Sequence, residues 1–298
     1  MLDLNKMSTE TRNVNTMNLD AMSPREIVEV MNQEDQNVIQ AVHGQLDQIA
    51  QAVVLITKAL ENSGRLIYMG AGTSGRLGVL DAVECVPTFG VEDDVVIGLI
   101  AGGEKAFVRA VEGSEDSKEL AQENLKQLNL CANDVVVGIA ASGRTPYVIS
   151  GLEYAREVGC KTVSVACNAN SAVSAYADVP IEAVVGPEVL TGSTRLKAGT
   201  CQKMILNMLS TASMVGIGKA YQNLMVDVLQ TNEKLHVRAQ NIVMQATGSS
   251  REEAADMLSK CDGNAKTAIV CILLRCDPDT AREKLSNAKG KVRDAIEA

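Results

Sequence analysis

A turn rich in glycine and hydroxyl side chains stands between a short apolar run and a helical pattern early in the chain. The apolar run covers residues 65–69, and the turn that follows contains Gly72, Thr73 and Ser74. Glycine lets the backbone turn sharply and approach a ligand, and a helix start offers unpaired N–H groups with a partial positive charge. The hydroxyl groups add hydrogen-bond donors. Together these features predict an anion-binding turn.

The glycine spacing of this turn argues against two common kinds of nucleotide-binding site. Gly70, Gly72 and Gly75 give the pattern G-x-G-x-x-G, but no acidic residue follows at the distance that dinucleotide binding requires. The Gly-Lys-Ser/Thr ending of a nucleotide-binding P-loop is also missing. The pattern alone is weak, so the prediction depends on what accompanies it.

Two further turns of the same composition lie later in the chain. The turn 141–146 contains Ser142, Gly143 and Thr145, and the turn 191–197 contains Ser193, Thr194 and Lys197. Ordinary helix capping explains any one of the three turns equally well. Three such turns at one edge of a sheet predict a metal-free phosphate cradle, with Ser142 and Thr145 as side-chain donors and Lys197 either balancing charge or solvated.

The elements that must position these turns alternate in type. Short apolar runs at 65–69, 94–100, 134–140, 161–167 and 180–186 alternate with helical patterns at 75–86, 104–128 and 145–158. Such alternation indicates an α/β fold, a parallel sheet sandwiched by helices. Ligands of such sheets bind at the carboxyl ends of the strands, where the three turns are expected.

Helical patterns also precede and follow the sheet region. Ser23, Pro24 and Glu26 form a helix start, and apolar residues recur at helical spacing to about residue 62. Helices are expected over 194–218 and 223–247, and three short ones over 251–260, 264–275 and 279–288. We therefore expect an N-terminal region at 1–62, an α/β domain at 63–248 and a small three-helix domain at 249–298.

Composition excludes several classes of function. The chain has 298 residues and a net charge of −9, which argues against nucleic acid and anionic membranes as partners. No apolar run reaches the roughly 18 residues of a membrane span. The eight cysteines form no C-x-x-C pair and there are only two histidines, so we expect a cytoplasmic protein without a metal site, structural zinc or disulfides.

The turns and several other segments resemble one enzyme family. The first two turns are similar to those of sugar isomerase (SIS) domains, which bind phosphosugars. Over nearly its whole length the chain resembles the N-acetylmuramic acid 6-phosphate etherase family, in the segments 9–13, 70–90, 111–116, 190–214 and 223–227. Leu196 and Cys201 depart from the expected Met and Ala, and neither change touches a functional group.

The resemblance implies an SIS-type fold, a homodimer, a phosphorylated amino-sugar substrate and no cofactor. The family hydrolyses the D-lactyl ether of N-acetylmuramate 6-phosphate to N-acetylglucosamine 6-phosphate and D-lactate, by elimination and then water addition. A base must remove the C2 proton of the open-chain sugar, and an acid must protonate the departing lactate oxygen. The resemblance places these roles on Glu84 and Glu115. It favours Glu84 as the acid and Glu115 as the base, and the reverse assignment stays open.

Each carboxylate also has an ordinary interpretation. A glutamate in a helix is usually a solvated surface charge, although Glu84 interrupts an apolar stretch from Val79 to Phe89. It could serve the ligand of its own subunit or that of a neighbour. Glu115 lies in an acidic cluster with Glu112 and Asp116, which by itself indicates only surface acidity.

Two other functions remain open at this point. An aldose–ketose phosphosugar isomerase of the same fold also needs a base at C2. A non-catalytic phosphosugar sensor, as in the related glucokinase regulatory protein, needs no pair of carboxylates. Glu84 and Glu115 together favour the etherase over the sensor, and release of D-lactate distinguishes it from the isomerase.

Overall fold

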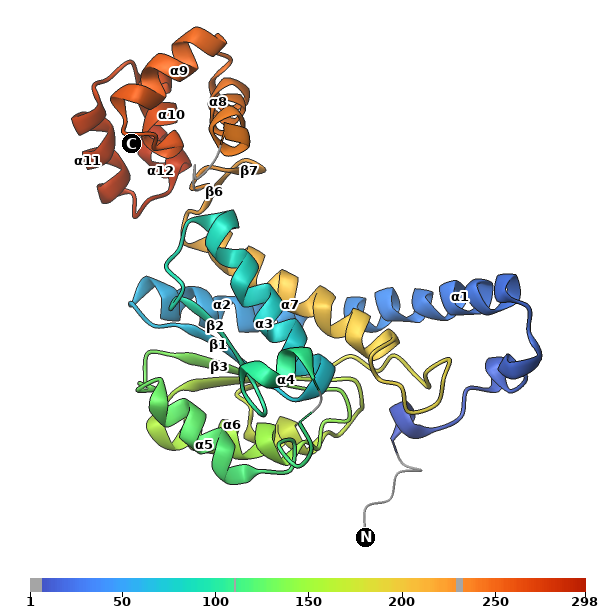
Figure 1. The fold of residues 1–298 in the computed structure, drawn as a ribbon. Coiled ribbons are helices and arrows are strands. Elements are labelled where there is room, and N and C mark those ends of the chain that lie inside the picture. Colours follow the sequence, from blue (N-terminus) through green and yellow to red (C-terminus); the bar gives the residue numbers. More distant parts are fainter. Residues whose placement is uncertain (1–6, 110, 229–232) are drawn as a thin grey trace. The chain divides into compact units, whose positions relative to one another are not determined.

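The computed structural model describes residues 7–109, 111–228 and 233–298 (Figure 1). Contacts divide the chain into two compact units, Met1–Val83 with Asp94–Ser210, and Glu84–Asp93 with Thr211–Ala298. The predicted domain boundaries after residues 62 and 248 stay a prediction.

The first unit is built on the predicted parallel sheet. Its five strands are arranged in the order β2-β1-β3-β4-β5, and every neighbouring pair is parallel. The strands β1 and β3 are buried along their whole length, as their apolar sequences require. The strands are β1 (Leu66–Gly70), β2 (Val96–Ile100), β3 (Val135–Ala140), β4 (Lys161–Ala166) and β5 (Val179–Glu182).

The strand order places a binding crevice between β1 and β3. Within the sheet, β2 lies next to β1 on one side and β3 lies next to β1 on the other side. The chain passes from β1 to β2 and then to β3, so the direction in which strands are added reverses between β1 and β3. Gly70, the last residue of β1, is aligned with Ile139 near the end of β3. Parallel sheets bind ligands at such a switch point, outside the carboxyl ends of the strands. The first and second hydroxyl-rich turns follow these two strands directly.

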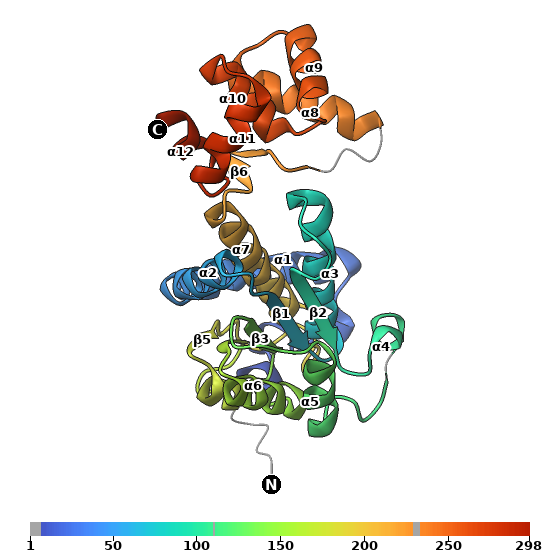
Figure 2. The same cartoon turned by 90° about the vertical axis from the view of Figure 1, so that its left-hand side faces the viewer.

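Helices cover both faces of the sheet (Figures 1 and 2). The helices α5 (Lys118–Gln127) and α6 (Pro146–Val158) pack on one face through a buried apolar cluster. On the other face lie α2 (Leu46–Glu61) and the beginnings of α3 (Gly72–Phe89) and α7 (Lys197–Gly216). There the buried Tyr68 of β1 donates its hydroxyl to Asp81 of α3 at 2.9 Å. This layered arrangement confirms the predicted fold class.

The N-terminal helices also confirm the prediction. The helix α1 (Pro24–His43) begins with a capping box in which Ser23 and Glu26 satisfy each other's backbone N–H groups, and α2 follows after a short turn. Among the residues that the structure describes, three short 3-10 turns precede α1, namely Ser8–Glu10, Val14–Thr16 and Leu19–Ala21.

The predicted continuous helix over 104–128 is wrong. The helix α4 (Glu104–Val108) ends early, and α5 begins only at Lys118. Gly113 takes a left-handed conformation with φ +77°, and the hydroxyl of Ser117 accepts the Leu120 N–H as the cap of α5. The break leaves Glu115 in the connecting segment rather than in a helix.

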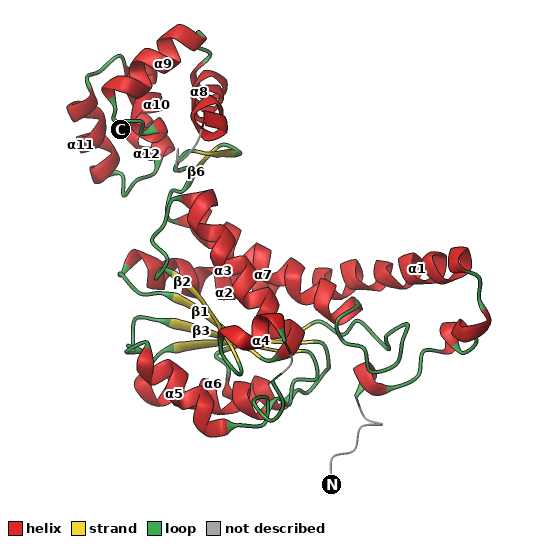
Figure 3. Ribbon diagram, viewed as in Figure 1, coloured by secondary structure: helices red, strands yellow, loops and turns green. Residues whose placement is uncertain are grey.

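In its described residues the second unit contains helices and one small hairpin (Figure 3). The hairpin of β6 (Ala220–Tyr221) and β7 (Leu224–Met225) replaces the start of the helix predicted from 223, since Gln222 between the strands has φ +53°. A short helix follows the three predicted ones. The helices are α8 (Glu233–Thr247), α9 (Arg251–Lys260), α10 (Ala265–Leu274), α11 (Pro278–Asn287) and α12 (Val292–Glu297). Within the described ranges, no helix is long and apolar enough to cross a membrane.

Candidate active site

The first turn joins β1 to α3 with almost no space between strand and helix. Gly72 begins α3 in the left-handed region, with φ +54°. A Cβ at Gly75 would lie 2.5 Å from the carbonyl oxygen of Gly70, so the approach requires glycine. The first N–H groups of a helix have no acceptor within the helix. The start of α3, with Gly72, Thr73 and Ser74, therefore offers backbone donors to an anion at the carboxyl edge of β1.

The second turn follows β3 at the neighbouring position. Gly143 is buried with φ +72°, and Ser142 accepts the Arg144 N–H at 3.3 Å. That bond uses a lone pair of the Ser142 hydroxyl and leaves its proton for a ligand. From the end of β4, Asn168 donates to the Ala141 carbonyl at 3.1 Å, which fixes the start of this turn.

The second turn also holds Glu115. The hydroxyl of Thr145 donates to the Glu115 carboxylate at 3.0 Å, and the Tyr147 N–H donates to the Glu115 carbonyl at 3.0 Å. Thr145 is 6% exposed, whereas Glu115 is exposed. The single hydroxyl proton of Thr145, predicted as a phosphate donor, is thus engaged by a carboxylate. These contacts bring one of the two predicted catalytic residues to the second turn.

The third turn does not present its helix start to a ligand. The fully buried Glu188 accepts the N–H groups of Lys197 and Ala198, each at 2.9 Å, and so caps α7. Burial raises the pKa of Glu188, and the two N–H bonds and the charge of Lys197 only partly offset this. Because a carboxylate already occupies this helix end, α7 begins at Lys197 rather than at the predicted residue 194.

The side chain of Lys197 lies in a buried ion pair. Its Nζ is 2.6 Å from Glu34 Oε2, and the Lys197 side chain is 1% exposed. Asn13 and Asn15 each donate to the same carboxylate at 2.8 Å. Burial acts to raise the pKa of Glu34, but the bonds from Lys197, Asn15 and Asn13 outweigh it and hold the pKa below its ordinary value. The predicted ligand-binding cation is engaged by the N-terminal region.

The start of α7, which follows the third turn, packs against the first turn. A Cβ at Gly199 of α7 would lie 3.4 Å from Cγ2 of Thr73, and the Gly199 N–H donates to the Thr194 carbonyl at 3.0 Å. Ser193 and Thr194 are half-buried. In the next turn of α7, Gln202 Oε1 accepts the hydroxyl of Ser74 at 2.9 Å.

Four buried residues at the site escaped the sequence analysis: Glu34, Asn168, Glu188 and Gln202. One had a visible signal, because Glu34 interrupts the apolar stripe of α1 that continues in Val38 and Val42. The other three are single polar residues whose partners lie far away in the sequence.

Glu84 lies ten residues beyond Ser74 on α3 and is exposed. It belongs to the second compact unit, whereas Glu115 and the three turns belong to the first. Its part in the site stays a prediction.

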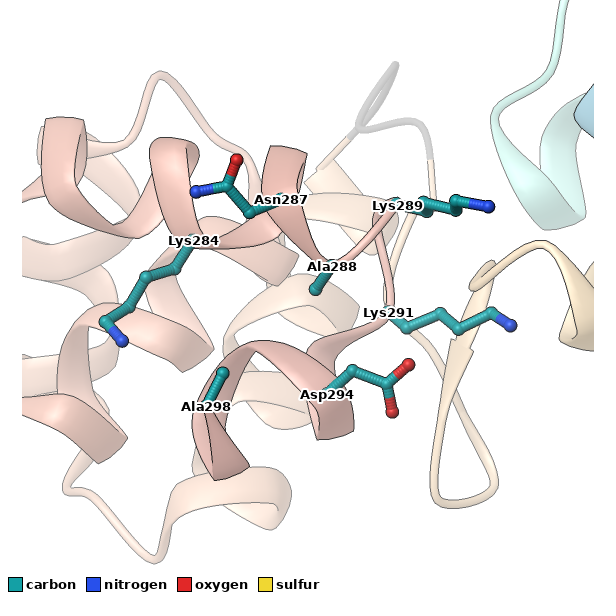
Figure 4. A pocket seen from close by; sticks show the side chains of 7 residues that line it. All are labelled: Lys284, Asn287, Ala288, Lys289, Lys291, Asp294 and Ala298. Carbon is teal, nitrogen blue, oxygen red and sulfur yellow. The ribbon is translucent and has the colours of Figure 1, made fainter.

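The second unit contains a cavity of its own. Its volume is about 420 Å³, and Figure 4 shows three lysines among the residues that line it. None of the predicted site residues lines it. The lining residues are Lys284, Asn287, Ala288, Lys289, Lys291, Asp294 and Ala298. In the part of the chain that the structure describes, no three His, Cys, Asp or Glu side chains are grouped to hold a metal ion.

Comparison with known proteins gives matches over nearly the whole chain. The model of the glucokinase regulatory protein N-terminal SIS domain matches residues 48–156, and the SIS domain model matches residues 114–212. The N-acetylmuramic acid 6-phosphate etherases of Bacillus mycoides (strain KBAB4) and Bacillus cereus (strain G9842) are each 57% identical over 293 residues. Each alignment covers 98% of this chain and 100% of the relative.

A solved structure shares its fold with part of this chain. A phosphoheptose isomerase from Francisella tularensis matches with a TM-score of 0.51 at 18% identity, over 65% of this chain and 99% of that chain. At this identity the likeness shows the SIS-type fold alone.

Proposed function

The chain belongs to the N-acetylmuramic acid 6-phosphate etherase family, and we propose here how its residues carry out the reaction. The protein is a carbon–oxygen lyase that cleaves the D-lactyl ether of N-acetylmuramate 6-phosphate to N-acetylglucosamine 6-phosphate and D-lactate. The 57% identity to curated etherases over 98% of the chain carries this conclusion.

The 6-phosphate binds at the start of α3, beside the second turn. Three observations support this position: the first N–H groups of α3, the Ser142 hydroxyl proton, and the switch point between β1 and β3. The starts of α6 and α7 are less suitable. Pro146 at the start of α6 has no N–H, and Glu188 occupies the start of α7. Ser142, Gly143 and the turn Gly72–Ser74 form the cradle.

The chemistry begins at C2 of the open-chain sugar, whose C1 aldehyde acidifies the C2 proton. Glu115 removes that proton, the C3–oxygen bond breaks, and Glu84 protonates the departing lactate oxygen. This elimination leaves a double bond between C2 and C3. Glu84 then takes a proton from water as its oxygen adds to C3, and Glu115 returns a proton to C2, so both carboxyl groups regain their starting states.

The contact between Thr145 and Glu115 supports the assignment of the base. A hydrogen bond from a hydroxyl fixes the direction of the carboxylate, and Thr145 is itself held at the start of α6. Thr145 therefore acts on the C2 proton through Glu115. Lys197 and Glu34 support the α7 side of the cradle rather than contacting substrate charge. Contact of Ser193 and Thr194 with the substrate stays a prediction.

One assay tests the reaction, namely D-lactate release from N-acetylmuramate 6-phosphate. We expect release from the phosphorylated substrate and much slower release from unphosphorylated N-acetylmuramate, because the cradle then has no anion to bind. Interconversion of aldose and ketose phosphates without lactate would indicate the isomerase instead. Binding of the phosphosugar with no turnover would indicate a sensor.

The enzyme acts as a homodimer in the cytoplasm. Exposed apolar side chains on the first unit support a second copy as partner, among them Val14 at 82%, Val54 at 65% and Val28 at 57% exposure. Buried thiols such as those of Cys160 and Cys167 support a reducing compartment. Sedimentation equilibrium of the full chain tests the dimer, and fractionation of the source cells tests the compartment.

A further inference from the structure

The hydroxyl proton of Ser74 is occupied in the structure. Ser74 Oγ donates to Oε1 of Gln202 at 2.9 Å, and the two residues are 7% and 1% exposed. A serine hydroxyl has one proton and two acceptor positions. A phosphate dianion accepts hydrogen bonds but donates none. With its proton on Gln202, Ser74 contributes only its backbone N–H to the anion.

Gln202 has an unused donor in the same place. Its Nε2 is buried and has no hydrogen-bond partner among the residues that the structure describes. A buried amide N–H₂ without a partner is unfavourable, because it has lost the hydrogen bonds that water would provide. The two ends of a carboxamide have nearly the same shape. A half-turn about the last side-chain bond therefore exchanges Nε2 and Oε1 without displacing other atoms.

We propose that Gln202 is a positioning residue that releases the Ser74 hydroxyl to the substrate phosphate. When the phosphate binds, the carboxamide turns, Nε2 donates to Ser74 Oγ, and the Ser74 proton is donated to the anion. Before the carboxamide rotates, there is one hydrogen bond between the Gln202 and Ser74 side chains. After the rotation there is still one hydrogen bond between these side chains, and the Ser74 hydroxyl makes a second hydrogen bond, to the phosphate. This inference rests on the phosphate position proposed above.

The packing of α7 explains why Gln202 can do this. Gly199 lies against Thr73, so the first turns of α7 rest directly on the first turn of α3. Gln202 follows one turn after Gly199, on the same helix. The third hydroxyl-rich turn therefore contributes to the cradle indirectly. It precedes α7, and α7 carries Gln202, whose carboxamide can either accept a hydrogen bond from Ser74 or donate one to it.

The test measures binding of N-acetylglucosamine 6-phosphate by calorimetry in a double-mutant cycle. The variant Gln202→Glu carries a carboxylate that only accepts, so it holds the Ser74 proton permanently and also repels the phosphate. We expect binding at pH 8 to weaken tenfold or more. In the Ser74→Ala background only the repulsion remains, so the same substitution should weaken binding less than threefold.

Two controls keep the result specific. Lys203→Gln, at an exposed neighbour on α7, makes the same change in charge and should weaken binding less than twofold. Lowering the pH towards 5 protonates part of the carboxyl group that Gln202→Glu introduces and restores a donor, so the ratio of variant to wild-type Kd should fall. A purely structural effect would leave that ratio unchanged with pH, and thermal midpoints would report any loss of folding.

An equal cost of Gln202→Glu with and without Ser74, or no cost at all, would overturn the inference. Calorimetry does not require turnover, so this outcome is distinct from failure of the proposed function. That failure would appear as wild-type protein that binds the phosphosugar yet releases no D-lactate.

Discussion

The hydroxyl of Thr145 donates to the carboxylate of Glu115 over 3.0 Å, across thirty residues of sequence. The contact joins the turn after β3 to the segment that separates α4 from α5. It connects a predicted phosphate-binding residue with a predicted base. Loss of the Thr145 hydroxyl therefore acts on the orientation of Glu115 as well as on the turn.

Thr145→Val keeps the shape of the side chain and removes its hydroxyl. We expect kcat to fall by about tenfold, since a hydrogen bond to a charged group contributes about 1.5–3 kcal/mol, while KM changes less than threefold. Thr145→Ser retains the hydroxyl and serves as the control. If KM instead rises tenfold with kcat unchanged, Thr145 binds the phosphate directly and our assignment is wrong.

The two carboxylates can be separated by isotope exchange. Glu84→Ala should lose D-lactate release yet still exchange the C2 proton with deuterated solvent, because the base is intact. Glu115→Ala should lose both activities. Mass spectrometry of recovered substrate follows the exchange. Exchange that survives only in the Glu115 variant would reverse the two roles.

Ser142→Ala removes a predicted hydroxyl whose proton remains for a ligand. A charge-assisted hydrogen bond contributes about 1.5–3 kcal/mol, so the Kd for N-acetylglucosamine 6-phosphate should rise by roughly tenfold or more. Ser286→Ala, at an exposed position of α11, is the matched control. Unchanged affinity in the Ser142 variant would place the phosphate elsewhere.

The ion pair of Lys197 and Glu34 should be a strong element of stability. Removing one partner of a buried pair costs about 3–5 kcal/mol, so Glu34→Gln should lower the midpoint of thermal unfolding clearly. The double variant Glu34→Gln with Lys197→Met should recover much of the loss, because it leaves no unpaired buried charge. A double variant that is no more stable than Glu34→Gln would show that the pair itself is not the cause.

The same pair predicts a dependence on pH. The pKa of Glu34 is lower in the folded protein than its ordinary value, which is about 4.3 in an unfolded chain. Its contribution to stability is therefore fully present above that value and is lost as the pH falls through the folded pKa. The difference in unfolding free energy between wild type and Glu34→Gln should be constant from pH 6 to 8 and shrink below about pH 4.

Activity should withstand EDTA. An aldehyde acidifies the C2 proton without a Lewis acid, and both proton transfers are assigned to carboxylates. We expect D-lactate release to be unchanged after dialysis against the chelator. Loss of activity that zinc or magnesium restores would refute this.

Much of the fold could be predicted because its signals are local. The apolar runs placed all five strands to within a few residues, and the Ser23 capping box placed the start of α1. The break before α5 was missed because the helical pattern continues through a segment that Gly113 interrupts.

The candidate site was predictable only in part. Adjacent turns after β1 and β3 follow from the parallel sheet, and so does an anion site at α3. The engagement of Lys197 by Glu34 does not follow, because it depends on how α1 packs against α7. The pairing of Ser74 with Gln202 likewise joins residues far apart in the sequence.

The buried carboxylate of Glu188 at the start of α7 has a consequence for discrimination among sugars. The chain supplies its own anion to one of the helix ends near the crevice, so that end repels a second phosphate instead of attracting it. A sugar bisphosphate should therefore compete more weakly than the corresponding monophosphate, and inhibition constants for such a pair would measure the difference. Glu188 thus favours substrates with a single phosphate without contacting the substrate.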